Sequence, residues 1–181
     1  MSEGNALVLK VTLDDPFGRA IDKPYRVLAV PADWLLYDLA RLIVGSFDFD
    51  FDHLFGFYNN IRNYGKSTEG YEYLGEMDEA SEFEGVTGIV VSKAFDKKGK
   101  KMLFLFDYGD HWCFIVTVED IVDAGEYEEL PCLIKSVGQA PAQYGEAEEE
   151  WDTEWDDDDD WSEDWSDDEW DEEWSDDDDD F

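Results

Sequence analysis

Residues 101–118 read KMLFLFDYGDHWCFIVTV, and this stretch decides the fold. Two runs rich in apolar and aromatic residues, 101–108 and 112–118, flank the polar segment Gly109, Asp110 and His111. Each run has the length of a β-strand, and a short glycine-containing connection between two such runs is typical of a hairpin. The pattern predicts a central antiparallel hairpin that is buried on both faces over part of its length.

Further strands are expected on both sides of this hairpin. Residues 6–13 (ALVLKVTL) and 25–30 (YRVLAV) have strand composition and are ended by turn-forming or proline-containing segments. Residues 53–58 (HLFGFY) predict a short strand, and residues 130–134 predict a short final one. The sheet is therefore expected to be mostly antiparallel.

One helix is predicted between the second and third of these strands. Asp33 follows Pro31 and is the expected N-cap, because its carboxylate can accept the free amide hydrogens of a first helical turn. From Trp34 onward, apolar residues recur at helical spacing as far as Gly45. The repeating residues are Leu35, Leu39, Leu42 and Ile43.

The remaining segments predict loops and one minor helix. Residues 47–52 alternate Phe with Asp, and since Asp is a poor strand residue we expect a loop. Residues 60–88 are expected to be irregular, residues 90–95 to form one or two helical turns, and residues 136–145 to form an exit loop. The predicted fold class is α+β, with one or two helices packed on a mostly antiparallel sheet.

Charge divides the chain into two parts. Of its 49 acidic residues, 24 lie in residues 146–181, which contain no Lys, Arg or His. The preceding part holds 25 acidic and 13 basic side chains, a formal charge of −12 against −24 for the tail. Adaptation to high salt would spread acidity and remove lysine, yet this part keeps nine Lys. We expect a folded domain over residues 1–145 and a disordered acidic tail over residues 146–181.

The tail also contains a repeated aromatic pattern. Three WxxxW units recur in it, and on a helix each pair of Trp side chains would lie on one face. Exposed Trp is typical of interface hot spots, so the pattern favours capture of a basic partner protein. Two alternatives are a purely solubilising tail and a segment that folds back on residues 97–101. The candidate partner-binding residues are Trp151, Trp155, Trp161, Trp165, Trp170 and Trp174.

Several landmarks in this order resemble the plasmid pRiA4b ORF-3-like family, also described as insertion-element passenger proteins of TnpR type. The matching pieces are LKVTL, YRVLAVPAD, FDHLFGF and, above all, FLFDYGDHWCFIVTVEDI at residues 104–121. Together they extend over about residues 6–145. The resemblance implies an α+β, roll-like fold and implies no reaction. No serine recombinase catalytic pattern is present in the sequence.

One group of residues has metal-binding chemistry. Asp107, Asp110 and His111 lie within five residues of one another, and with Asp52 and His53 they offer carboxylate and imidazole ligands. The alternative is structural, because Asp and Gly are common in tight turns, where they tolerate the backbone angles and accept local hydrogen bonds. A metal site requires His53 and His111 to face each other.

Other chemistries find little support. Cys113 follows Trp112 within a predicted strand, and we expect it and Cys132 to be free, buried thiols. No cofactor-binding motif is present, so we expect no cofactor, and the net negative charge argues against direct nucleic-acid binding. No apolar stretch is long enough to span a membrane, and a cytoplasmic location is expected. The sequence favours a non-catalytic binding or adaptor protein, with a metal-dependent enzyme centred on the Asp107 turn as the alternative.

Overall fold

The structure is a computed structural model that describes residues 4–75 and 81–144. Within these residues the strands form one eight-stranded sheet in the order β5-β4-β3-β6-β7-β1-β2-β8. All neighbouring strands are antiparallel except β4 and β5, which are parallel. The strands are β1 (Asn5–Leu13), β2 (Tyr25–Pro31), β3 (Phe55–Tyr58), β4 (Gly70–Tyr73), β5 (Glu84–Gly85), β6 (Lys101–Phe106), β7 (Trp112–Asp123) and β8 (Cys132–Val137).

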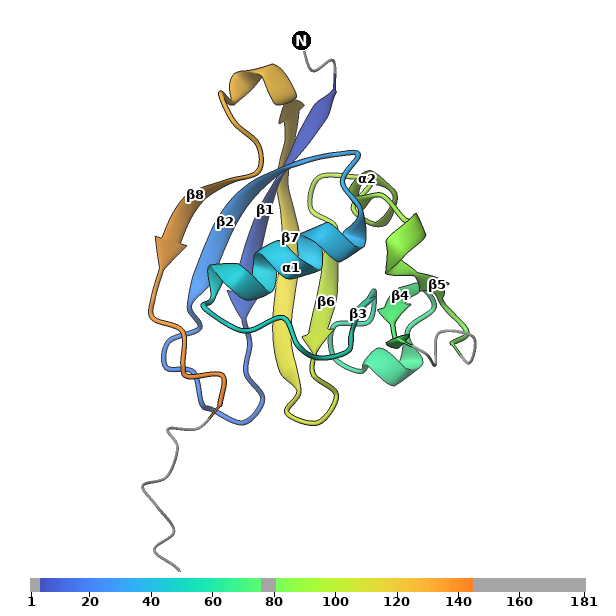
Figure 1. Cartoon of the computed structure of the whole chain (residues 1–181), viewed down its shortest axis with the longest axis vertical. Coiled ribbons are helices and arrows are strands. Elements are labelled where there is room, and N and C mark those ends of the chain that lie inside the picture. Colours follow the sequence, from blue (N-terminus) through green and yellow to red (C-terminus); the bar gives the residue numbers. More distant parts are fainter. Residues whose placement is uncertain (1–3, 76–80, 145–181) are drawn as a thin grey trace, which may run out of the picture. The chain divides into compact units, whose positions relative to one another are not determined.

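Two α-helices, α1 (Leu36–Ser46) and α2 (Val91–Ala94), accompany the sheet. Figure 1 shows α1 lying across one face of the sheet, in front of the central strands. Both helices bury their apolar residues in the same hydrophobic cluster. The predicted α+β class with a mostly antiparallel sheet is confirmed. The acidic tail and its six Trp residues, at 146–181, lie outside the described residues.

The hairpin predicted from residues 101–118 is present as β6 and β7, at the centre of the sheet. Five consecutive residues of β6, from Met102 to Phe106, are buried, as a central strand packed on both faces requires. The partner strand β7 alternates between buried and half-buried residues and continues to Asp123, beyond the predicted end. The extension of β7 occurs because the whole of β1, from Asn5 to Leu13, pairs with it as far as Asp123.

The prediction for the first turn of α1 was wrong. The helix begins at Leu36, its N-cap is Leu35, and no side chain caps it. Asp33 does not cap the helix, because the residues where the helix was predicted to begin form backbone hydrogen bonds with residues 89–92 instead. Leu36 N donates to Ile89 O at 2.9 Å and Val91 N donates to Trp34 O at 2.7 Å.

The segment with alternating Phe and Asp is a loop, as predicted, and the alternation has a packing reason. Phe47 and Phe49 are buried while Asp48 and Asp50 are exposed. Phe49 lies 4.7 Å from the Trp112 ring, measured between centroids, so the loop after α1 closes one end of the core. The loop therefore delivers the next residues, Asp52 and His53, to the β6–β7 turn.

Residues 60–88 are more regular than the sequence indicated. They contain the strands β4 and β5 and the short 3-10 helices η1 (Tyr64–Lys66) and η3 (Val86–Gly88). Strand β4 pairs with β3, and two of its four residues are tyrosines, which favour strands. In addition, β8 ends at Val137 rather than Ile134, because it pairs with β2 as far as Tyr25.

None of the helices in the described part of the chain is long and apolar enough to cross a membrane.

Candidate functional site

The turn between β6 and β7 is built around Asp107. Its backbone has a left-handed conformation (φ 65°), and its side chain is almost fully buried. Asp107 Oδ1 accepts hydrogen bonds from Gly109 N at 2.9 Å and Asp110 N at 3.2 Å. Asp107 O also accepts from His111 N at 2.7 Å. This is the local carboxylate capping that the structural interpretation of the turn predicted.

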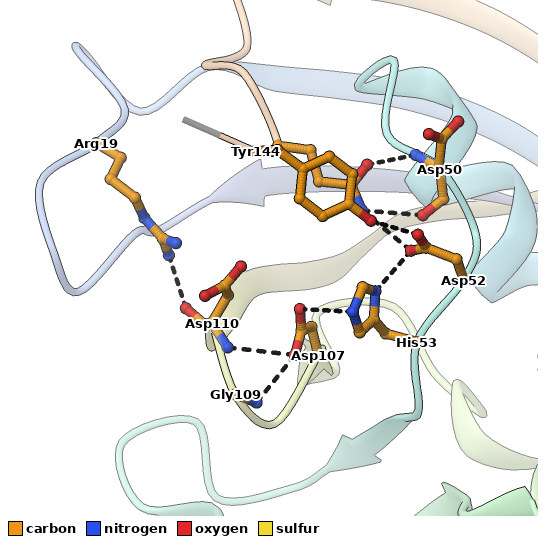
Figure 2. A network of polar contacts seen from close by, with 9 residues as sticks. Arg19, Asp50, Asp52, His53, Asp107, Gly109, Asp110 and Tyr144 are labelled. Carbon is orange, nitrogen blue, oxygen red and sulfur yellow. Dashed lines mark hydrogen bonds and ion pairs between the residues drawn. The ribbon is translucent and has the colours of Figure 1, made fainter. Parts of the chain in front are cut away.

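His53 lies between two carboxylates, as Figure 2 shows. Its Nδ1 is 2.5 Å from Asp52 Oδ1 and its Nε2 is 3.3 Å from Asp107 Oδ2. An ionised carboxylate only accepts hydrogen bonds, so His53 donates its Nδ1–H in the hydrogen bond with Asp52. The contact of Nε2 with Asp107 is an ion pair when the imidazole is protonated. The backbone fixes this geometry, because Asp107 N donates to Leu54 O at 2.9 Å.

The last described residues are bound to the same network. Tyr144 donates its hydroxyl hydrogen to Asp52, and Gln143 forms hydrogen bonds of 2.6 and 3.0 Å with the backbone of Asp50. The Tyr144 hydrogen bond is the main cause that lowers the pKa of Asp52; His53 acts in the same direction and slight burial opposes both. The same hydrogen bond raises the pKa of Tyr144 to about 12.

Arg19 secures the turn from its other side. Its Nη2 donates to Asp110 O at 2.9 Å and pairs with Asp15 Oδ1 at 2.9 Å. The guanidinium also lies over the Trp112 ring, 3.5 Å from the centroid, in a cation–π contact. Burial acts to raise the pKa of Asp15, but the hydrogen bonds from Arg19 and from nearby amides outweigh it, so that pKa is lowered.

The structure divides the five residues that the sequence offered as metal ligands. It joins His53 to Asp107, but the His111 ring packs edge-on to Phe17, at 6.3 Å between centroids. In the described residues Asp110 contacts Arg19 through its backbone oxygen rather than its carboxylate. No group of three or more His, Cys, Asp or Glu side chains within residues 4–75 and 81–144 is arranged to hold a metal ion.

The two cysteines and the basic segment at residues 97–101 were the other candidates for function. Cys113 and Cys132 are free and half-buried, and burial raises the pKa of the Cys113 thiol to about 11, which keeps it protonated near neutral pH. In the basic segment at residues 97–101, Lys100 pairs with Glu69 at 3.0 Å, while Lys97 and Lys98 are exposed. Lys97 and Lys98 thus lie in a solvated turn, Lys101 begins β6, and part of the charge of the segment is neutralised.

Sequence reasoning missed the contribution of residues 143 and 144. Gln143 and Tyr144 are separated from Asp50 and Asp52 by about ninety positions, so local spacing gives no sign of the contact. Arg19 was missed for the same reason. The one available signal was chemical: a Tyr and a Gln stand at the end of a Pro- and Gly-containing loop in which most neighbours are small.

The fold and the site together define a class of protein: an α+β domain with one long helix on an antiparallel sheet and a carboxylate–imidazole network at the central hairpin turn. The model of the plasmid pRiA4b ORF-3-like protein family matches residues 5–179, and the chain belongs to this family. The resemblance expected from residues 6–145 is confirmed.

Among solved structures, the chain is similar to MM3350, a protein of unknown function from Methanosarcina mazei Go1. The two share 20% sequence identity with a TM-score of 0.58, over 75% of this chain and 70% of that one. At this identity the similarity shows the fold alone. No curated protein matches the chain.

Proposed function

We propose that this chain is a non-catalytic binding protein, in which the α+β domain holds the start of the acidic segment and that segment engages a basic partner protein. The supporting observation is the attachment of Gln143 and Tyr144 to Asp50 and Asp52, immediately before residue 146. A segment that leaves a rigid domain from a fixed point loses less conformational freedom on binding than one attached through a loose linker.

The state of the polar network favours binding over catalysis. A general base needs a free lone pair within reach of a substrate proton. Both nitrogens of His53 already face carboxylates, and Asp107 is occupied by His53 and two turn amides. These groups hold the loop after α1, the β6–β7 turn and residues 143–144 together, so a structural role accounts for them best.

The chemistry of residues 146–181 defines the partner class. Its carboxylates suit a surface rich in Lys and Arg, and each WxxxW unit offers two aromatic anchors that bury large apolar area in pockets. A basic protein with apolar pockets meets both requirements. The segment then occupies the surface that would otherwise contact phosphates and stacked bases of a nucleic acid.

The test uses three forms of the protein as bait in affinity capture: the full chain, a chain ending at residue 145, and a full chain with all six tail Trp changed to Ala. We expect proteins of high isoelectric point to be captured by the full chain and lost from the truncated one. The Trp variant keeps the charge, so loss of the same proteins from it assigns the aromatic side chains a direct role. An unchanged list of captured proteins in the truncated form would refute the proposal.

A second candidate, a metal-dependent enzyme, rests on one observation: the His53 ring contacts Asp52 at 2.5 Å through one nitrogen and Asp107 at 3.3 Å through the other. To bind at His53 Nδ1, a divalent cation would have to displace the proton of the hydrogen bond between His53 and Asp52. Elemental analysis of the purified protein tests it, with His53→Ala and His111→Ala as controls. Metal that is absent, or unaffected by both substitutions, counts against the enzyme.

A further inference from the structure

The face of the sheet opposite α1 carries an uneven distribution of charge. Strand pairing places five residues side by side across β6, β7, β1, β2 and β8 on this face. Three of them are lysines, although the chain as a whole contains 49 acidic residues and 13 basic ones. We call this set the lysine row; its members are Lys101, Thr117, Lys10, Val27 and Lys135.

A second row runs beside the first, two residues further along each strand, and presents mostly apolar and aromatic surface. It includes Tyr25, whose ring has Lys10 Nζ at 4.4 Å and Lys135 Nζ at 5.8 Å from the centroid. Two ammonium groups thus lie close to one aromatic ring. We call this set the tyrosine row; its members are Leu103, Ile115, Thr12, Tyr25 and Val137.

The three lysines of the row are available to a ligand. Among the described residues, none of them forms an ion pair with a carboxylate, whereas Lys23, Lys93 and Lys100 each do. Lys101 and Lys135 are exposed and Lys10 is half-buried. Lysines without carboxylate partners on a folded surface are favourable for an incoming anion, because each ammonium group can pair with it without first breaking an ion pair.

The spacing of the row suggests what kind of anion fits. Lys101, Lys10 and Lys135 stand on every second strand, and strands lie ~4.8 Å apart, so neighbouring lysines are about 10 Å apart. A segment in the polyproline II conformation has three residues per turn and rises about 3.1 Å per residue, so its side chains at every third position lie on one face about 9 Å apart. Such a segment, crossing the strands, can therefore bring one carboxylate to each lysine.

We propose that this face is a docking surface for an acidic peptide segment of a partner protein in the polyproline II conformation, with carboxylates at every third position and an aromatic or apolar side chain over the tyrosine row. This goes beyond the function proposed above, which concerns residues 146–181 and a basic partner. At physiological salt the screening length is ~8 Å, so carboxylates of the described residues that lie farther than this from the lysine row oppose such binding only weakly.

The experiment measures binding of labelled peptides to the full chain by fluorescence anisotropy. One peptide has three Asp at positions i, i+3 and i+6 around a single Trp; the other has the same composition with the three Asp adjacent. We expect the spaced peptide to bind more tightly, and its affinity to fall about tenfold in the triple variant Lys10→Gln, Lys101→Gln, Lys135→Gln, as three weak surface ion pairs imply.

A matched variant, Lys66→Gln, Lys97→Gln, Lys98→Gln, removes the same charge from exposed lysines outside the row and should leave binding nearly unchanged. Equal loss in the two triple variants, equal affinity for the two peptides, or no binding by the full chain would each overturn the proposal. The same measurement on a chain ending at residue 145 tests whether residues 146–181 occupy this face themselves. If the truncated chain bound the spaced peptide more than tenfold more tightly than the full chain, the face would be assigned to residues 146–181 instead.

Discussion

The two faces of the sheet use similar strands for different purposes. On the face that α1 covers, alternate residues of β1, β6 and β7 are buried and join one aromatic and aliphatic cluster. On the opposite face, the intervening residues of β1 and β7 are half-buried, and lysines stand among them. The same period-two alternation thus yields a core on one side and a candidate binding surface on the other. Stability should depend on the first face and recognition on the second.

The largest expected effect comes from the helix-covered face. Phe104 is fully buried, and its ring lies 4.8 Å from Phe57 and 5.6 Å from Phe114 between centroids. We expect Phe104→Ala to lower the free energy of unfolding by ~3–5 kcal/mol, because it removes apolar burial and leaves a cavity. Urea denaturation followed by circular dichroism measures the change.

The matched substitution on the other face is Ile115→Ala. Ile115 is half-buried and belongs to the tyrosine row, so we expect a loss of only ~1 kcal/mol. Equal losses for Phe104→Ala and Ile115→Ala would mean that the face opposite α1 is covered in solution, and the division between core and binding surface would fail.

The next effect concerns Arg26, which is only 5% exposed although it is charged. Its guanidinium donates to Ser46 O at 2.9 Å, Val137 O at 3.2 Å and Gly138 O at 3.1 Å. These contacts join the end of α1 to the end of β8. We expect Arg26→Met to cost ~2–3 kcal/mol of unfolding free energy, since the carbonyl groups lose a charged donor.

Lys10→Met provides the control for Arg26→Met, because Lys10 stands on the opposite face and forms no ion pair in the described part of the chain. We expect its effect on stability to remain within ~0.5 kcal/mol. Thermal unfolding of both variants compares them directly. A large loss in Lys10→Met would give the lysine row a structural role and weaken its assignment to binding.

Much of the helix-covered face could be predicted from the sequence. The runs at β6 and β7 are long, apolar and aromatic, and the apolar repeat of α1 is strongly helical, so local pattern and tertiary packing agree. The start of α1 could not be predicted, because backbone contacts with residues 89–92 replaced the expected Asp33 cap. Strand β4 was missed because it is only four residues long and lies in a stretch, residues 60–88, that contains five glycines and many acidic residues.

The candidate site was predictable only in part. The presence of carboxylates at a tight turn follows from turn chemistry, and Asp107 has that role. Which distant residue meets Asp107 depends on strand order, which no local pattern encodes. The contacts of His53 with Asp107 and of Tyr144 with Asp52 arise because the loop after α1 and the chain after β8 reach the same end of the sheet.

A smaller effect tests how closely the face opposite α1 is packed at β3. Tyr58 OH lies 2.6 Å from Tyr108 OH and donates to Glu72 at 2.6 Å. A Cβ atom added at Gly56 would lie 2.6 Å from Tyr58 OH and 2.8 Å from Tyr108 OH. We expect Gly56→Ala to destabilise the protein by ~1–3 kcal/mol, because these hydroxyl groups must separate.

Gly45→Ala is the control, since Gly45 lies in α1 and a Cβ there meets no atom within 4 Å. We expect this substitution to stabilise the protein by ~0.5–1 kcal/mol through lower entropy of the unfolded chain. Chemical denaturation gives both values, and opposite signs are the expected result. If Gly56→Ala also stabilised the protein, the tyrosine contacts on this face would not be formed in solution.

The smallest effect on stability concerns Asp52, at the rim of the helix-covered face. Its pKa is lowered from the ordinary value of 3.8, chiefly by the hydrogen bond from Tyr144. The ionised carboxylate therefore stabilises the folded state above pH 4, and this stabilisation is lost as the pH falls through the lowered pKa. Because the Asp52 side chain is 46% exposed, solvent screening keeps the contribution well below ~1 kcal/mol.

Tyr144→Phe removes that hydrogen bond, so the pKa of the Asp52 carboxyl should rise towards its ordinary value. The signal of the carboxyl carbon, followed by NMR during an acid titration, measures it. Tyr127→Phe is the control, because the described structure shows no hydrogen bond from Tyr127 to a carboxylate. A pKa of Asp52 that does not respond to Tyr144→Phe would mean that Tyr144 is not held at Asp52 in solution. The fixed attachment that supports a binding role for residues 146–181 would then be lost, while the lysine row on the opposite face would be unaffected.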